Sequence, residues 1–208
     1  ENQLCDPESG VLPAAGMILE TVQGEGGVIA PSADWLRGIR RITRDAGVPL
    51  ILESFVAFER EVSVIAARAI DGTVKSFDVA ENVHRNGILH TSTLPARITA
   101  ETQEMARTAA ERLQSALDYV GVIGMEFFVM PDGALIANEI APRVHNSGHW
   151  TEAACAVSQF EQHIRAVAGL PLGSTACGPL PVTMPNLMGA DIDSVPTLLA
   201  DDAAHVHH

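Results

Sequence analysis

Lysine is nearly absent from this chain, in which twelve arginines accompany a single lysine, Lys75. Basic residues total 13 against 26 acidic ones, which gives a formal net charge of −13. A nucleic-acid-binding surface needs clustered Lys and Arg, so this balance excludes nucleic acid as a partner. The shortage also leaves few candidates for holding nucleotide phosphates, a task that enzymes commonly share between lysines and arginines.

Long hydrophobic runs are absent as well. No stretch approaches the roughly 18 to 20 apolar residues that span a bilayer, and the start of the chain lacks the basic-then-apolar layout of a signal peptide. The three cysteines, Cys5, Cys155 and Cys177, are odd in number and widely spaced. This spacing fits neither a disulfide framework nor a paired zinc knuckle. We therefore expect a soluble, cytoplasmic protein with reduced thiols and no membrane partner.

The order of apolar runs and turn residues indicates an α/β protein of the α+β type. Two short apolar runs flank a helix that begins after Ser32 and stops at Gly47, which is the order of a βαβ unit. From Glu53 onward the pattern changes to antiparallel strands flanked by helices. The sequence thus predicts two domains, residues 1–49 and residues 50–208.

Within the second domain, turn signals and hydrophobic periods define the expected elements. Asp71-Gly72 and Asp132-Gly133 are strong signals for two-residue hairpin turns. The expected elements are strands at 59–70, 73–80, 121–130 and 134–140, a polar loop at 81–98, helices at 99–118 and 151–168, and a last strand at 181–189. Pro185 assigns that last strand to a sheet edge.

Two glutamates on the second hairpin form the most informative pattern. If Asp132-Gly133 is a two-residue turn, Glu126 lies directly opposite Glu139 on the same face of the sheet. Like charges in this arrangement are destabilising unless positive charge lies between them. Mg²⁺ would supply it, since this ion takes one or two carboxylates plus phosphate oxygens, and Asn138 offers another oxygen. The alternative is an acidic pair on the solvated face of an ordinary hairpin.

The loop after this hairpin is dense in polar side chains. Arg143 offers a planar fork for a phosphate or carboxylate, and His145 and His149 can exchange protons near neutral pH. Asn146 and Ser147 are short polar residues suited to a binding loop. We expect this loop to bind substrate. The alternatives are a loop that satisfies its own hydrogen bonds, and a zinc site for which no third protein ligand is evident.

Several segments resemble the 5-(carboxyamino)imidazole ribonucleotide synthase family of ATP-grasp ligases. The most specific is Asn138-Glu-Ile-Ala-Pro-Arg-Val-His-Asn-Ser-Gly-His-Trp-Thr151. The other matching segments are 53–61, 62–68, 81–84, 87–89, 119–128, 158–161 and 169–173. The similarity covers about residues 50–208. It implies an ATP-grasp carboxyl-terminal subdomain that uses ATP and Mg²⁺ to attach bicarbonate to aminoimidazole ribonucleotide in purine biosynthesis.

The resemblance also implies roles for single positions. Glu53 falls where the adenine side of ATP is contacted, Glu61 where the ribose hydroxyls are held, and His84 at a nucleotide contact. The remaining positions are the magnesium ligands Glu126 and Glu139, Asn138 beside them at the nucleotide, and the catalytic loop residues Arg143, His145, Asn146, Ser147 and His149.

The chain also departs from this family. Enzymes of this kind carry an amino-terminal nucleotide-fold domain and a lid with phosphate-binding lysines, and we find neither. Residues 14–49 instead resemble part of a class III pyridoxal-phosphate aminotransferase, although the lysine and aspartate of that chemistry are missing. We therefore expect a fused, truncated ligase, weakly active or inactive alone, that forms a homodimer through exposed apolar surface. The alternative is a chimeric, non-catalytic scaffold with a relict nucleotide site.

Overall fold

The computed structural model describes residues 14–20, 31–53 and 56–207. The chain divides into two compact units, Glu1–Ala57 and Phe58–His208. None of the helices in the described ranges is long and apolar enough to cross a bilayer.

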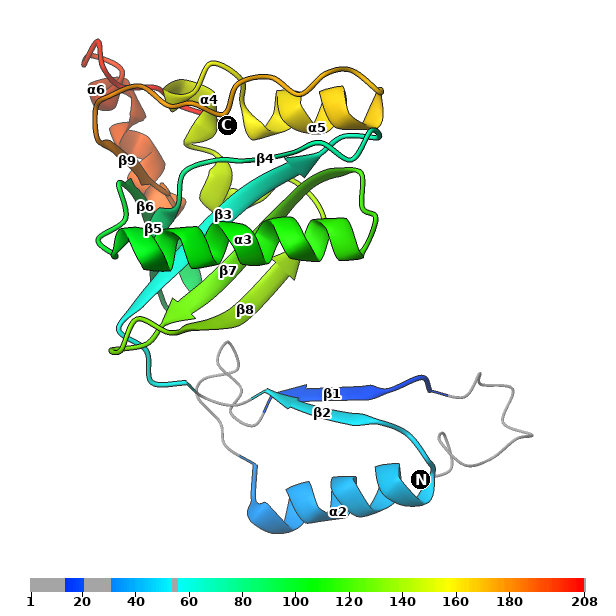
Figure 1. Ribbon diagram of the computed structural model, residues 1–208. Coiled ribbons are helices and arrows are strands. Elements are labelled where there is room, and N and C mark those ends of the chain that lie inside the picture. The colour runs from blue at the N-terminus through cyan, green and yellow to red at the C-terminus, as the bar shows by residue number, and fades with distance from the viewer. Residues whose placement is uncertain (1–13, 21–30, 54–55, 208) are drawn as a thin grey trace. The chain divides into compact units, whose positions relative to one another are not determined.

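The first unit contains a short βαβ arrangement (Figure 1). Its elements are β1 (Met17–Glu20), α2 (Ala33–Asp45) and β2 (Leu50–Glu53). The two strands pair in parallel. The hydroxyl oxygen of Ser32 accepts a hydrogen bond from the Trp35 amide at 3.2 Å, which caps α2 as its sequence predicts. The predicted strand–helix–strand order is confirmed.

The second unit is built on a seven-stranded antiparallel sheet with the order β8-β7-β3-β5-β6-β9, and β4 pairs with β3 beside this path. The strands are β3 (Arg60–Arg68), β4 (Val74–Ser76), β5 (Ala80–Arg85), β6 (Ile88–Leu94), β7 (Gly121–Val129), β8 (Leu135–Ala141) and β9 (Val182–Pro185). The last strand lies at one edge of the sheet, as Pro185 predicts.

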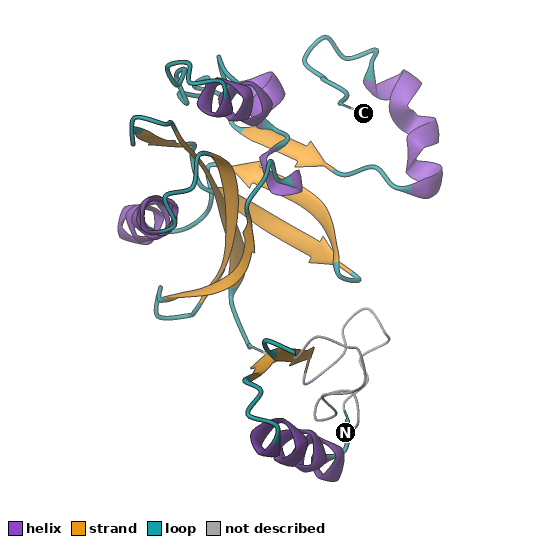
Figure 2. Ribbon diagram, turned by 90° about the vertical axis from the view of Figure 1, so that its right-hand side faces the viewer, coloured by secondary structure: helices purple, strands orange, loops and turns teal. Residues whose placement is uncertain are grey.

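Helices cover the two faces of this sheet unequally. The long helix α3 (Ala100–Ala116) crosses the front of β3 and β7 in Figure 1, and Figure 2 shows it on one side of the curved sheet. Ala106 and Ala110 of α3 pack on Val62 and Val64 of β3 in one core cluster. The other helical elements are η1 (Asn146–Gly148), α4 (Thr151–Ala154), α5 (Gln159–Val167), η2 (Gly189–Ser194) and α6 (Val195–Leu198).

The second core cluster lies on the sheet face away from α3. Ile65 and Ala67 of β3 pack there with Phe77, Trp150 and Ala166. The helices α4 and α5 cover only part of this face, and polar side chains occupy the part nearer the start of β3. This polar part of the face is the candidate site.

Three of the predicted strand, helix and loop ranges in this unit are wrong. The expected loop at 81–98 contains the hairpin β5–β6, closed by Asn86 and Gly87, which both have positive φ. The expected helix at 151–168 is two helices, because Cys155 is extended and the Ser158 hydroxyl caps α5. The expected strand at 73–80 is split, since β4 ends at Ser76 and β5 begins at Ala80.

Candidate functional site

The candidate site begins as a row of polar side chains on the sheet face opposite α3. On β3, Glu61 lies opposite Asn82 of β5, and Ser63 lies opposite Glu126 of β7. Since alternate residues of a strand share a face, Glu61 and Ser63 point the same way, and their cross-strand partners join them. The strand register therefore gathers polar groups from three neighbouring strands.

The β7–β8 hairpin adds the second glutamate. Glu126 pairs with Glu139, as predicted, but the path to this pair differs from the predicted one. The loop contains three residues, 131–133, because the Met130 amide donates to the Ala134 carbonyl at 2.8 Å. A bulge at Asn138 then absorbs the resulting one-residue offset. The two glutamates face each other because the longer loop and the bulge compensate.

His145 lies between these glutamates. Its Nδ1 is 3.7 Å from Oε1 of Glu126 and 2.8 Å from Oγ of Ser147, and its Nε2 is 3.5 Å from Oε1 of Glu139. Burial lowers the pKa of His145, because the charged imidazolium is poorly solvated there. A largely neutral imidazole thus separates two carboxylates without cancelling their charge.

Glu126 is the strongly perturbed acid of the site. Its side chain is only 8% exposed, whereas that of Glu139 is 50% exposed. Burial, added to by the charges of Glu139 and Glu61 and opposed by His84 and Ser147, raises the pKa of Glu126 to about 7. A cation placed beside a buried carboxyl that holds its proton near neutral pH stabilises the ionised form of that carboxyl.

Glu61 and His84 form a second acid–imidazole pair on the same face. Nδ1 of His84 contacts Oε2 of Glu61 in a short hydrogen bond. This bond raises the pKa of His84, and the charges of Glu126 and Glu139 add to the rise. His84 is therefore the positive group of the cluster, in contrast to His145.

The loop that carries His145 is fixed by close packing. A Cβ added at Gly124 would lie 2.6 Å from Cβ of His145, and one at Gly148 would lie 2.6 Å from the Ile65 side chain. Gln159, fully buried, accepts from the His145 amide at 2.9 Å and donates to its carbonyl at 2.7 Å. The position of His145 thus depends on two glycines and one buried amide.

The structure brings together some of the predicted site residues and not others. Glu61, His84, Glu126, Glu139, His145 and Ser147 form one cluster. Arg143 is exposed and donates to the carbonyl of Val144 at 2.8 Å, although its charge still lowers the pKa of His145. Asn146 and Asn138 are exposed beside the cluster.

Of the remaining predicted residues, His149 lies apart from the cluster. The ring of His149 packs on Phe160 at 5.3 Å and on His207 at 4.8 Å between centroids. Burial, followed by the charge of His207, lowers its pKa. Glu53 ends β2 in the first unit, and its side chain is outside the described atoms. The roles predicted for these two residues stay predictions.

Sequence reasoning missed three buried polar residues of this face. Ser92 of β6 donates to Oδ1 of Asn82 at 2.9 Å. Within the part of the chain that the structure describes, Nδ2 of Asn82 and Oγ of Ser63 have no hydrogen-bond partner. A signal for such a face was present in the sequence, since polar residues alternate along two neighbouring strands. They are Glu61 and Ser63 on β3, and Asn82 and His84 on β5.

The donors suit a hard cation better than zinc. Among the described residues, no group of three or more His, Cys, Asp or Glu side chains is placed to hold a metal ion alone. Mg²⁺ needs fewer protein ligands, because phosphate oxygens and water complete its octahedron. Glu126 and Glu139 fit this requirement, since both carboxylates face one neutral imidazole and, among the described residues, His84 lowers the pKa of Glu126 by less than burial raises it.

Lys75 does not contribute to this cluster. It lies on β4, and its Nζ donates to the carbonyls of Leu172 and Gly173, each at 3.0 Å. The single lysine is thereby occupied with backbone groups. Among the charged side chains of this chain, arginine and imidazolium are therefore the ones left to meet a phosphate at the candidate site.

The chain is similar in sequence to known proteins. A model of the ATP-grasp domain matches residues 18–160. An N5-carboxyaminoimidazole ribonucleotide synthase of Brucella melitensis is 60% identical over 188 residues, which is 88% of this chain and 51% of that protein. The chain therefore spans about half the length of this curated relative. The comparisons do not support the aminotransferase resemblance of residues 14–49, since the ATP-grasp match begins at residue 18.

Solved structures similar to this chain carry the same family name. The crystal structure of an ADP complex of an N5-carboxyaminoimidazole ribonucleotide synthetase is similar with a TM-score of 0.68 and 42% identity, over 83% of this chain and 45% of that one. The Aspergillus clavatus N5-carboxyaminoimidazole synthase, in complex with ADP and 5-aminoimidazole ribonucleotide, is similar with a TM-score of 0.66 and 31% identity, over 70% of this chain and 40% of that one.

Proposed function

Because the chain belongs to the ATP-grasp family, we propose that it carries the nucleotide- and magnesium-binding part of an N5-carboxyaminoimidazole ribonucleotide synthase. The reaction is the ATP-dependent carboxylation of aminoimidazole ribonucleotide with bicarbonate, a step of purine biosynthesis. The names of its relatives and the ligands in the similar crystal structures support this proposal.

One observation carries the proposal: two glutamates from adjacent strands meet the same buried, neutral imidazole. Their nearest oxygens lie 3.7 Å and 3.5 Å from the two nitrogens of His145. A solvated acidic pair, the alternative weighed from sequence, would leave both carboxylates in water. Here Glu126 is buried and its pKa is raised to about 7. Such an arrangement is unfavourable for stability and favourable for binding a cation.

Glu126 and Glu139 would hold the magnesium ion, with Asn138 at the bulge beside them. When bound, Mg²⁺ neutralises charge on the ATP phosphates and orients them. The chain's own contribution is to hold the two carboxylates in place. Gly124 and Gln159 do so indirectly, because they fix the imidazole on which both carboxylates converge.

The remaining polar residues divide between nucleotide and substrate. Glu61 and His84 would hold the ribose and the nucleotide, with Glu53 toward the adenine. A charged His84 compensates part of the acidic field that would otherwise repel phosphate. Arg143, Asn146, Ser147 and His149 would line the place of the imidazole nucleotide and of phosphoryl transfer, where the exposed guanidinium of Arg143 suits a phosphate.

Calorimetric titration of Mg²⁺-ATP tests the proposal. We expect saturable heat with the wild-type chain and a loss of affinity of at least about tenfold in Glu139→Gln, since one ionic ligand disappears. Glu104→Gln is the matched control, because Glu104 is exposed on α3, on the far side of the sheet. A flat titration of the folded wild type would instead support the non-catalytic scaffold with a relict site.

Activity of this chain alone is a separate matter. We propose that turnover is weak or absent without the remaining half of the relatives' length. A cytoplasmic location and a homodimer stay predictions from sequence, and sedimentation analysis of the purified chain checks the second.

A further inference from the structure

A pair of thiols lies outside the candidate site. Cys155 is the extended residue that ends α4, and Cys177 belongs to the segment between α5 and β9. The two residues form an isolated antiparallel bridge, and their sulfur atoms are 2.9 Å apart. Both are free cysteines of intermediate exposure, so small reagents in solvent can reach them.

The backbone around these cysteines already has the geometry that a disulfide needs. The Gly178 amide donates to the Ala154 carbonyl at 3.0 Å, which encloses Cys155 and Cys177 as a non-hydrogen-bonded pair. In such a pair the Cα atoms are about 4.5 Å apart, inside the range of about 4.4 to 6.8 Å found across disulfides. Only the sulfurs must move, by roughly 1 Å, to reach the bond length of about 2 Å.

We propose that Cys155 and Cys177 are a redox modification site, which a low-molecular-weight disulfide converts reversibly into an intramolecular disulfide. The proposal does not depend on the nucleotide site. It differs from the prediction of three unrelated reduced thiols, because sequence spacing gave no reason to bring residues 155 and 177 together.

The exchange proceeds in two displacements. The Cys177 thiolate attacks one sulfur of the small disulfide, forms a mixed disulfide and releases one small thiolate. Cys155 then loses its proton and its sulfur attacks Cys177, which releases the second small thiolate. Two protein thiols are oxidised to one disulfide, one small disulfide is reduced to two thiols, and an excess of dithiol reverses both steps.

The pKa values of the two thiols shift in opposite directions. The hydrogen-bond contact with Cys155 lowers the pKa of Cys177, while burial and the charge of Asp78 oppose this effect. The same contact, together with burial, raises the pKa of Cys155. This contrast and the cavity lined by Thr175 and Ala176, the residues just before Cys177, favour Cys177 as the sulfur that attacks first and Cys155 as the one that resolves the mixed disulfide.

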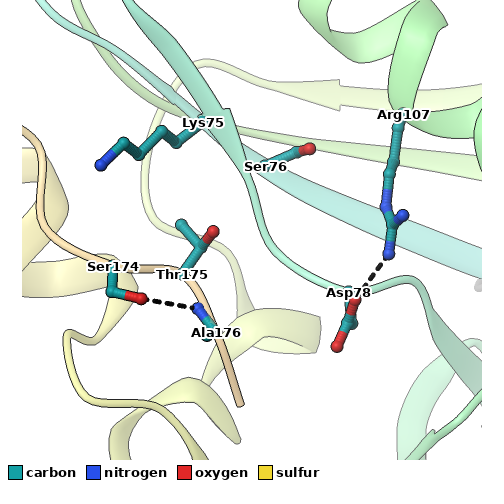
Figure 3. A pocket seen from close by; sticks show the side chains of 7 residues that line it. All are labelled: Lys75, Ser76, Asp78, Arg107, Ser174, Thr175 and Ala176. Atoms are coloured by element: carbon teal, nitrogen blue, oxygen red, sulfur yellow. Dashed lines mark hydrogen bonds and ion pairs between the residues drawn. The ribbon is translucent and has the colours of Figure 1, made fainter.

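An open cavity of about 490 Å³ borders the segment that leads to Cys177. Thr175 and Ala176, the two residues before Cys177, line it together with Lys75, Asp78 and Arg107 (Figure 3). Arg107 is paired with Asp78 at 2.5 Å and Lys75 with backbone carbonyls, so the cavity offers polar walls and no dedicated anion site. It leaves solvent-open space beside the segment that carries Cys177.

Oxidised glutathione, followed by N-ethylmaleimide and trypsin without reduction, tests the proposal on the unmodified chain. Trypsin separates the three cysteines into peptides 1–37, 144–165 and 166–208, because Arg37, Arg143 and Arg165 border them. We expect a species joining 144–165 to 166–208 in the monomer band, absent after dithiothreitol. Glutathione adducts on both cysteines without that link, or links to peptide 1–37 or between chains, would overturn the proposal.

Cysteine variants test the order of events and the effect on stability. Cys155→Ser should accumulate the glutathione adduct at Cys177, whereas Cys177→Ser should react far more slowly. Closing the loop from 155 to 177 should raise the Tm of the wild type by about 5 to 10 °C. Cys5→Ser is the control that keeps this rise. An oxidised, cross-linked wild type with an unchanged Tm, or equal adduct formation in both variants, contradicts these expectations.

Discussion

Glu126 and Glu139 lie opposite each other on β7 and β8 because two irregularities of the hairpin cancel. The three-residue loop shifts the register by one, and the bulge at Asn138 shifts it back. Bulges often occur beside active sites, where they redirect a side chain. In this hairpin the bulge places the side-chain amide of Asn138 next to the carboxylate of Glu139, which faces the candidate metal position.

Deletion of Asn138 tests whether the bulge serves binding. Without it, Glu139 would take the regular position opposite Glu126, so the sheet should form and the free energy of unfolding should change by less than about 1 kcal/mol. Affinity for Mg²⁺-ATP should fall, because a regular strand lacks the local twist with which the bulge orients the Glu139 carboxylate. Asn138→Ala, which keeps the bulge and removes the amide, separates backbone from side chain. Undiminished affinity in the deletion variant would contradict the functional reading of the bulge.

Glu126→Gln should change how stability depends on pH. The folded pKa of Glu126 is raised from 4.5 to about 7. Above pH 4.5 the unfolded chain therefore ionises this group while the folded chain keeps its proton, and stability falls until about pH 7. Because Gln does not titrate, the variant should gain about 3 kcal/mol relative to wild type across this interval. Urea unfolding at pH 4.5 and 8 with a chelator present measures the difference.

Added Mg²⁺-ATP should reverse this difference at pH 8, because the wild type gains binding energy that Glu126→Gln loses. Glu104→Gln, exposed on α3, should follow the wild type at both pH values. A difference between wild type and Glu126→Gln that does not vary with pH would show that Glu126 is not the buried, perturbed acid described above.

His84→Gln should show the opposite pH dependence. The hydrogen bond to Glu61 raises the folded pKa of His84 above 6.5. Its contribution to stability is then fully present below pH 6.5 and is lost as the pH rises through the folded value. We expect the variant to cost about 1 to 3 kcal/mol at pH 5.5 and clearly less at pH 9. A double-mutant cycle with Glu61→Gln, measured at both pH values, isolates the pair, and a coupling independent of pH would refute this assignment.

Gly124→Ala should disturb the site through His145. The added methyl would lie 2.6 Å and 2.8 Å from Cβ and Cγ of that residue, too close for either side chain to remain. We expect a loss of about 1 to 3 kcal/mol of stability and weaker Mg²⁺-ATP binding. Gly178→Ala, whose added methyl lies 4.0 Å from its nearest neighbour, should stay within about 0.5 kcal/mol of wild type. Similar behaviour of the two variants would contradict the close packing at Gly124.

Local signals in the sequence predicted much of this fold. Ser32 predicted the start of α2 and Pro185 the edge strand. The predicted Glu126–Glu139 pair is confirmed, although the two-residue turn from which it was derived is a three-residue loop and the bulge restores the register. The β5–β6 hairpin was missed although Asn86-Gly87 is a strong turn signal, because the polar residues around it suggested a loop. The break before α5 was also readable, since Ser158 and Glu161 have the spacing of a capping box.

Long-range features were beyond the reach of sequence reasoning. The position of His145 depends on its packing against Gly124 and on Gln159, which come from β7 and α5. The approach of Cys155 to Cys177 likewise depends on how the chain returns after α5. Hydrophobic period and turn chemistry describe segments one at a time, so they predict neither contact.

Anomalous diffraction from crystals of the chain grown with Mn²⁺ and ATP tests the central claim most directly, because Mn²⁺ takes the oxygen ligands of Mg²⁺ and can be located by its anomalous signal. We predict one ion with carboxylate oxygens of both Glu126 and Glu139 at about 2.1 to 2.3 Å and a phosphate oxygen of ATP in the same sphere. Bound nucleotide whose metal ion contacts neither glutamate would contradict the account.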